Sequence, residues 1–285
     1  MKNSQNIKKI NFSDKNEKLL NNDDTLDIQK SFHDYGIIEF VNLPWHKNEI
    51  QNFTDYFTSK YSNDAARRKR KFDKTNINSV DSGHNMIPLH SEASFSYAYP
   101  EIIWFYCYEN DSKGSPTTIC DGEKLWEILD KETKKYFLKN PITFKLSIDI
   151  PYKNKNKDTE DLLIESLGVS NAKIDWKNGK MIFDHTKFVI NVDKKSDKLW
   201  FANHLIVGSK KEDQIYDIYA SDGKPIPLGI LDEIKSKADD ITIEYFWEKD
   251  CLLMLNNYRY MHGRKDFDPS SKREILNLQS LKINF

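Results

Sequence analysis

The sequence predicts a mainly β protein with flanking helices, folded as an antiparallel sandwich or barrel. Many short segments are continuously apolar or alternate apolar with polar residues, and only a few have helical periodicity. No GxGxxG or GxxxxGK[ST] element occurs, so a nucleotide-binding α/β fold has no support. The 285 residues include 16 Phe, 14 Tyr and 6 Trp, which supply enough apolar area for one packed core.

Residues 1–24 are rich in Asn, Lys and Asp, and we expect them to form a flexible arm before a single domain at 25–285. Within this domain, the apolar run 102–108 is typical of a strand buried on both faces, and the strict alternation over 142–150 indicates a half-buried strand. Asp121 can cap a helix that Pro141 ends. The remaining predicted elements are helices at 27–33, 48–61 and around 230–234, and strands at 36–41, 181–192, 241–247, 251–255 and 275–285.

One part of the chain lacks a clear pattern. The stretch 151–180 is rich in Lys and Asn and has little periodicity, which indicates an inserted surface segment. We expect an insert or lid near 151–240 that begins with this stretch.

Composition excludes several classes of function. The 43 Lys and Arg balance 44 Asp and Glu, so the chain lacks the excess of cations that nucleic-acid binding needs. No apolar run approaches the roughly 20 residues that span a bilayer, and no secretory signal is present. Three widely spaced cysteines without a CxxC pair suggest reduced core thiols. We therefore expect a cytoplasmic protein that binds neither nucleic acid nor membrane.

A candidate metal site begins at His90. Glu92 follows two residues later, and on an extended chain this spacing points both side chains to one face. A third ligand must come from elsewhere, and His262 follows the predicted strand 251–255 by a short loop. Two His and one carboxylate on one face of an octahedral ion are the non-haem Fe(II) arrangement, which leaves positions for a co-substrate and O₂. The alternative is a His90–Glu92 hydrogen bond without a metal.

The arginines add a second signal. Three of the six arginines lie near or after His262 in the sequence: Arg259, Arg264 and Arg273. The other three lie in the basic run 67–70. Arg273 stands two residues before the last predicted strand, 275–285, where its guanidinium could bind a carboxylate bidentately. The alternative is a surface salt bridge, because Glu274 is its neighbour.

Several blocks resemble one enzyme family. The segment 89–95 (LHSEASF), followed by 99–107 (YPEIIWFYC), is similar to the metal-binding block of the taurine dioxygenase-like Fe(II)/2-oxoglutarate-dependent oxygenases. Its HxE form resembles the branch that contains clavaminate synthase and the aspartate hydroxylase of syringomycin assembly. Further matches lie at 114–118, 200–204, 221–226, 247–257 and 262–264. Asn256, Ser115-Pro116 and Ser271-Lys272 depart from the family pattern. The resemblance runs from about residue 30 to the C-terminus and implies a double-stranded β-helix (jelly-roll) core.

The resemblance also implies a mechanism. His90, Glu92 and His262 would hold Fe(II), and Thr117 and Arg273 would bind the C5 carboxylate of 2-oxoglutarate, with Lys272 as the alternative anchor. O₂ is the other co-substrate, and oxidative decarboxylation yields succinate and CO₂. The expected outcome is hydroxylation of an unactivated C–H bond in a small amino-acid-like substrate, free or bound to a carrier protein, in natural-product biosynthesis.

Other readings stay open. Desaturation or cyclisation can follow from the same chemistry, the fold could serve a non-catalytic β-sandwich binding protein, or the same ligands could serve a metalloenzyme that does not use 2-oxoglutarate. Asn203 and Arg264 are the candidate substrate contacts, whereas His204 is expected to be a buried core residue. The basic run 67–71 is either a solvated face or a docking site for an acidic carrier protein.

Overall fold

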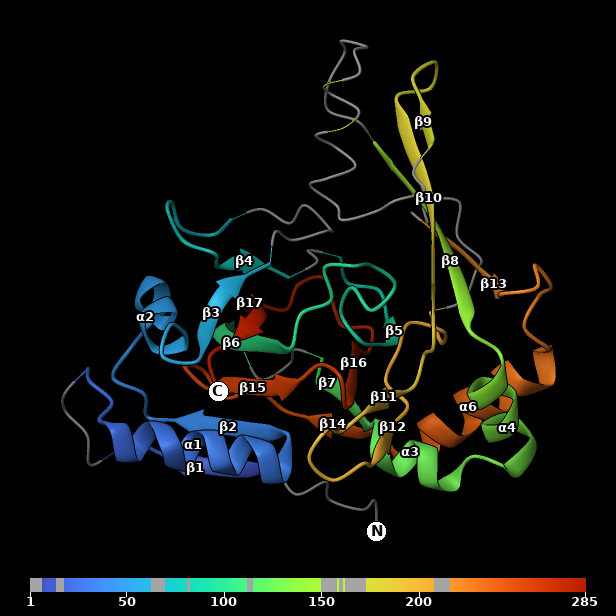
Figure 1. The fold of residues 1–285 in the computed structure, drawn as a ribbon. Helices are drawn as coiled ribbons and strands as arrows, with labels where there is room; N and C mark the ends of the chain where they lie inside the picture. The colour runs from blue at the N-terminus through green and yellow to red at the C-terminus, as the bar shows by residue number, and fades with distance from the viewer. Residues whose placement is uncertain are drawn as a thin grey trace.

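The computed structural model describes residues 7–13, 18–62, 70–80, 83–111, 115–149, 158, 161, 173–207 and 216–285. Its largest sheet has the strand order β1-β2-β15-β6-β17-β3, with β4 paired to β17 (Figure 1). Only the β1–β2 pair in this sheet is parallel among the described pairs. The strands of this sheet are β1 (Lys8–Asn11), β2 (Ile37–Val41), β3 (Thr58–Tyr61), β4 (Asn78–Ser79), β6 (Ile102–Asn110), β15 (Leu252–Asn256) and β17 (Arg273–Ile283).

A smaller antiparallel sheet faces the large one. Its strand order is β14-β7-β16-β5, with β5 at Ile87–His90, β7 at Thr117–Asp121, β14 at Ile243–Tyr245 and β16 at Tyr260–Arg264. One hydrophobic cluster joins apolar side chains of both sheets, among them Phe105 of β6, Ile119 of β7 and Leu253 of β15. The predicted antiparallel sandwich is therefore confirmed, with part of its core between these two sheets.

Strand β6 shows why the run 102–108 is apolar on both faces. Ile103, Phe105 and Cys107 belong to the cluster between the sheets, whereas Trp104 and Tyr106 belong to a second cluster on the outer face of the large sheet. Helices α1 (Asn22–Tyr35) and α2 (Ile50–Thr54) contribute to that outer cluster. The 3₁₀ turn η1 (Lys47–Glu49) precedes α2. Both faces of β6 are therefore buried, as predicted.

A third cluster lies on the outer side of the smaller sheet. Helices α3 (Gly122–Ile128), α4 (Lys131–Lys139) and α6 (Leu228–Ile241) pack there, together with β8 (Ile142–Asp149) and β10 (Lys180–Lys187). Strands β8 and β10 form a sheet with β9 (Lys173–Asp175) and β13 (Tyr216–Ala220), and the end of this sheet that carries β9 projects away from the rest of the described chain (Figure 1). Strands β11 (Asn191–Val192) and β12 (Leu199–Trp200) pair separately. Most of the predicted insert 151–180 lies outside the described residues.

The N-terminal prediction is wrong in part. Residues Lys8–Asn11, expected in a flexible arm, form β1 beside β2, and Phe12 and Leu20 are buried. The apolar residues there are few, but an edge of the large sheet offers unpaired backbone groups for them to join. The predicted single domain at 25–285 stays a prediction.

Several other boundaries differ from the predictions, and three of them have a clear local cause. Helix α1 starts earlier, because the Asn21 side chain accepts a hydrogen bond from the Asp24 backbone N–H. The predicted helix 48–61 stops at Thr54, and its last residues form β3 against β17. The helix capped by Asp121 is divided into α3 and α4, because the intervening residues Leu129 and Asp130 have extended backbones.

None of the helices that the structure describes combines the length and apolar character needed to cross a membrane.

Candidate metal centre and anion pocket

Strands β5 and β16 bring together two histidines that are distant in the chain. His262 lies directly opposite His90 in the antiparallel ladder, and opposed side chains share one face of a sheet. Their ring centroids are 4.5 Å apart. Gly263 follows, and a Cβ there would lie 2.5 Å from the Ile87 carbonyl oxygen. The close approach of β5 and β16 therefore requires glycine beside the second histidine.

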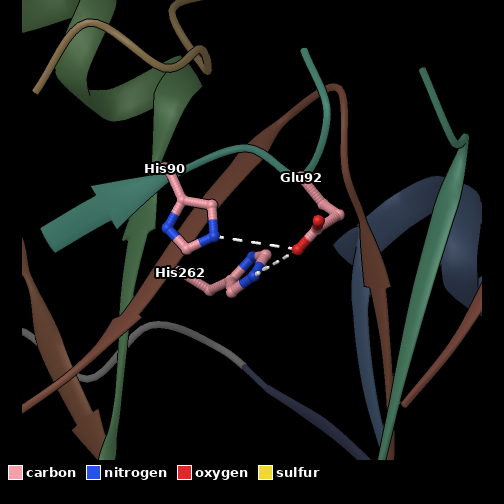
Figure 2. Close-up of side chains that lie close together, drawn as sticks. All are labelled: His90, Glu92 and His262. Carbon is pink, nitrogen blue, oxygen red and sulfur yellow. Dashed lines mark ion pairs between the residues drawn. The ribbon is translucent and has the colours of Figure 1, made fainter. Parts of the chain in front are cut away.

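Glu92 approaches the two histidines from a turn (Figure 2). Strand β5 ends at His90, and Ala93 has a left-handed φ of 52°. The expectation that an extended spacing of two aligns His90 with Glu92 is therefore wrong in its geometry, although the two side chains do converge. A non-glycine residue at positive φ persists only where its surroundings hold it.

The three side chains can share one metal ion. Oε2 of Glu92 lies 3.8 Å from Nε2 of His90 and 3.9 Å from Nε2 of His262 (Figure 2). One ligand atom of each residue lies within 4.8 Å of the others, and all three residues are buried. Two imidazoles and one carboxylate are a donor set that suits Fe(II).

The orientation of His90 also fits a metal. Its Nδ1 lies 2.9 Å from the carbonyl oxygen of Pro88. A carbonyl only accepts, so Nδ1 is the donor, and Nε2, on the side of Glu92, is the nitrogen available to a metal. Metal-binding histidines commonly donate their other N–H in this way.

Asn257 holds the backbone of Glu92. Its Oδ1 accepts a hydrogen bond from the Glu92 N–H at 2.8 Å, and its Nδ2 donates to the carbonyl oxygens of Glu92 and Pro100, both at 2.9 Å. The Asn257 side chain is fully buried and comes from the turn between β15 and β16. One side chain thus ties the Glu92 turn to the hairpin that carries His262.

A cavity adjoins the three ligands. It is lined by Val80, Ile87, His90, Glu92, Phe105, Thr117, His262, Gly263, Arg264, Arg273, Ile275 and Asn277. Both predicted 2-oxoglutarate residues, Thr117 and Arg273, are thus in the same cavity as the predicted ligands.

Arg273 is aimed by two hydrogen bonds. Its Nε donates to the Ser115 carbonyl oxygen at 2.9 Å, and its Nη2 donates to Thr117 Oγ1 at 3.3 Å. Burial, and then the nearby charge of Arg264, lower the pKa of Arg273 to about 10. An anion in the cavity would relieve both effects. Lys272 is exposed and does not line the cavity, so the geometry favours Arg273 as the anchor.

Arg264 lies at the edge of this cavity. Its Nη2 donates to the carbonyl oxygens of Gly83 at 2.6 Å and Asn85 at 3.0 Å. The guanidinium carbons of Arg264 and Arg273 lie 5.0 and 5.7 Å from the ring centroid of Phe267. Arg264 can therefore contact a ligand while it also holds the loop before β5.

Asn203 has a different environment from the one predicted. Its Nδ2 donates to the Val189 carbonyl oxygen and its Oδ1 accepts from the Leu205 N–H, and it does not line the cavity. His204 is buried, with its ring centroid 5.0 Å from that of His90. Burial and His90 lower the pKa of His204 to about 3. A substrate role for Asn203 stays a prediction without geometric support.

Sequence reasoning missed Asn277. It is 1% exposed, lines the cavity, and its Oδ1 has no hydrogen-bond partner in the described structure. Arg273, Ile275 and Asn277 alternate along β17, so the period of two from Arg273 was a usable signal. Gly114, in the predicted turn 114–118, lies outside the described residues.

Comparisons with known proteins point to one enzyme family. Residues 3–279 match the model of the family described as taurine catabolism dioxygenase TauD, TfdA family. A clavaminate synthase-like protein from Arabidopsis thaliana is 19% identical over 267 residues, covering 83% of this chain and 79% of that protein. The dapdiamide synthesis protein DdaC from Enterobacter agglomerans is 22% identical over 207 residues, which are 64% of this chain and 62% of that protein.

Solved structures show the same fold. A taurine dioxygenase from Burkholderia xenovorans superimposes with a TM-score of 0.64 at 10% identity, over 95% of this chain and 83% of that one. The predicted double-stranded β-helix core is therefore confirmed.

Proposed function

Because the chain belongs to the TauD/TfdA dioxygenase family, we propose that it hydroxylates an unactivated C–H bond of a small amino-acid-like substrate. As a member of that family it is an oxidoreductase whose cofactor is Fe(II) and whose co-substrates are 2-oxoglutarate and O₂. The observation that carries the proposal is one cavity that joins a His-Glu-His cluster to an arginine and threonine pair.

His90, Glu92 and His262 would hold the iron, since Nε2 of each histidine and a carboxylate oxygen of Glu92 converge. Iron bound there would supply the redox chemistry that couples the oxidation of substrate by O₂ to the decarboxylation of 2-oxoglutarate, with succinate and CO₂ as co-products. Arg273 and Thr117 would bind the C5 carboxylate, which lies far from the iron, and thereby fix the orientation of bound 2-oxoglutarate. Val80, Ile87 and Ile275 line the cavity and limit access of water.

Asn277 supports an amino-acid-like substrate. Its Oδ1, buried and without a partner in the described structure, can accept a hydrogen bond from an ammonium or amide N–H. Arg264, in the same cavity, suits a carboxylate. A relative named for dapdiamide synthesis is consistent with a role in natural-product biosynthesis.

An anaerobic titration tests the proposal. Fe(II) and 2-oxoglutarate together should produce a visible metal-to-ligand charge-transfer band, and Glu92→Ala should weaken it. Succinate release across a panel of free amino acids and carrier-bound aminoacyl groups then identifies the substrate class. A product that gains one oxygen atom supports hydroxylation, and one that loses two hydrogens supports desaturation or cyclisation. The absence of the band with wild-type protein would favour a non-catalytic binding protein or a metalloenzyme without 2-oxoglutarate.

Docking of an acidic carrier protein stays a prediction. Residues 67–69 of the basic run lie outside the described residues. The Nζ of Lys71 lies 2.6 Å from Glu274 Oε1 and 4.8 Å from the Tyr108 ring centroid. Lys71 therefore pairs with a residue of this chain, which leaves its charge less available to a carrier protein. Reversal of the charges at 67–70 should lower turnover of carrier-bound substrate only, and unchanged turnover would exclude docking there.

A further inference from the structure

Trp247 makes one hydrogen bond to Thr117, a residue that lines the cavity. Its Nε1–H donates to Thr117 Oγ1 at 2.8 Å, and Arg273 Nη2 donates to the same oxygen at 3.3 Å. Indole and guanidinium N–H groups only donate. Thr117 Oγ1 is therefore an acceptor in both contacts.

The two contacts determine where the Thr117 proton points. A hydroxyl has two acceptor lone pairs and one proton, so Trp247 and Arg273 occupy the acceptor sites and leave only donation. Thr117 is 5% exposed and lines the cavity, and its hydroxyl donates to no group in the described part of the chain. Buried hydroxyl protons normally find an acceptor. The cavity ligand is the acceptor that this arrangement requires.

The surroundings of Trp247 keep its N–H in place. The side chain is buried, its ring lies 4.7 Å from that of Tyr245 at 85°, and its backbone carbonyl accepts from Asn110 Nδ2 at 2.8 Å. An indole fixed in this way offers one donor direction, so Thr117 cannot turn its proton toward Trp247 without facing another hydrogen. The hydroxyl is set before the ligand arrives.

We propose that Trp247 is a positioning residue, which fixes the Thr117 hydroxyl as a hydrogen-bond donor to the far carboxylate of 2-oxoglutarate. The inference rests on the proposed function, because it concerns the affinity for that co-substrate. Trp247 is not among the residues that line the cavity, so it acts through Thr117 and not by contact with iron or 2-oxoglutarate. It thus controls 2-oxoglutarate affinity and leaves metal affinity unchanged.

Trp247→Phe tests this role, since it removes the N–H and keeps an aromatic ring. Anaerobic titrations of the charge-transfer band measure the Kd of 2-oxoglutarate, and a chelator competition measures the Kd of Fe(II). We expect the first Kd to rise roughly three- to tenfold, the value of one hydrogen bond, and the second to stay constant. Trp200→Phe is the matched control, because Trp200 Nε1 is buried and has no hydrogen-bond partner in the described residues.

A double-mutant cycle separates positioning from general damage. Thr117→Val should weaken 2-oxoglutarate binding, and adding Trp247→Phe to it should have no further effect. Additive effects, or equal losses of iron and 2-oxoglutarate affinity, would overturn the proposal. An unchanged Kd in Thr117→Val would also overturn it, whatever the folding of Trp247→Phe. If wild-type protein binds iron but gives no 2-oxoglutarate band, the proposed function itself fails.

Discussion

Asn257→Ala should both destabilise the protein and weaken its metal site. The substitution removes one hydrogen bond accepted from the Glu92 N–H, a longer one accepted from Ser91 Oγ at 3.2 Å, and two donated bonds, to the carbonyl oxygens of Glu92 and Pro100. These groups surround a fully buried side chain. At about 1–1.5 kcal/mol for each bond, the free energy of unfolding should fall by roughly 3–5 kcal/mol. That is a large part of the stability of an ordinary domain.

The effect on iron follows from the strained turn. Without Asn257, the backbone beside Ala93 can relax from its positive φ and turn the Glu92 carboxylate away from the histidines. Loss of a residue that orients a ligand commonly weakens metal binding by about 10- to 100-fold. Urea unfolding of the metal-free protein measures the first effect, and anaerobic chelator competition measures the second.

Asn256→Ala is the matched control. Asn256 Oδ1 accepts from the N–H groups of Tyr258 and Arg259 in the same turn and does not contact Glu92. It should therefore lower stability by about 1–2 kcal/mol without changing iron affinity. The reasoning is refuted if Asn257→Ala binds Fe(II) as tightly as wild type, or if Asn256→Ala weakens iron binding as much.

Three further predictions follow from the structure. Arg273→Lys should raise the Kd of 2-oxoglutarate by about tenfold or more, because lysine lacks the planar guanidinium that can bind a carboxylate through two N–H groups. Lys272→Ala should leave this Kd unchanged. A larger effect of Lys272→Ala in the charge-transfer titration would show that Lys272, and not Arg273, binds the carboxylate. Asp121→Ala should cost about 2–4 kcal/mol in urea unfolding, because it removes a helix cap and the carboxylate that Arg259 binds through Nε and Nη2, and leaves Arg259 paired with Glu123 at 3.3 Å. A loss of less than about 1 kcal/mol would show the Asp121–Arg259 pair to be weak. Burial lowers the pKa of Lys187 to about 8, so between pH 8 and 10.5 the unfolded chain keeps a proton that the folded protein has lost, and the amount by which Lys187 destabilises the fold shrinks as the pH rises. Lys187→Met should thus be more stable than wild type at pH 7 by about 1–3 kcal/mol, and this advantage should shrink by pH 10; a constant difference would contradict the shift.

Residue types and their local patterns determined much of this protein. The apolar run at 102–108 correctly predicted β6, and the alternation at 142–150 correctly predicted β8. A strand buried on both faces needs consecutive apolar side chains, and one buried on a single face needs alternate ones. The predicted ligands His90, Glu92 and His262 do converge, and blocks in family order indicated them.

Only the tertiary structure decided how these groups are held. Glu92 faces the histidines because Asn257, 165 residues away, binds its backbone in a left-handed turn, and not because of an extended spacing. Whether the Thr117 hydroxyl donates or accepts in the cavity depends likewise on Trp247, which is distant from Thr117 in the sequence. Sequence periodicity encodes the conformation of neighbouring residues, whereas these contacts arise only when strands distant in the chain pair and bring their turns together.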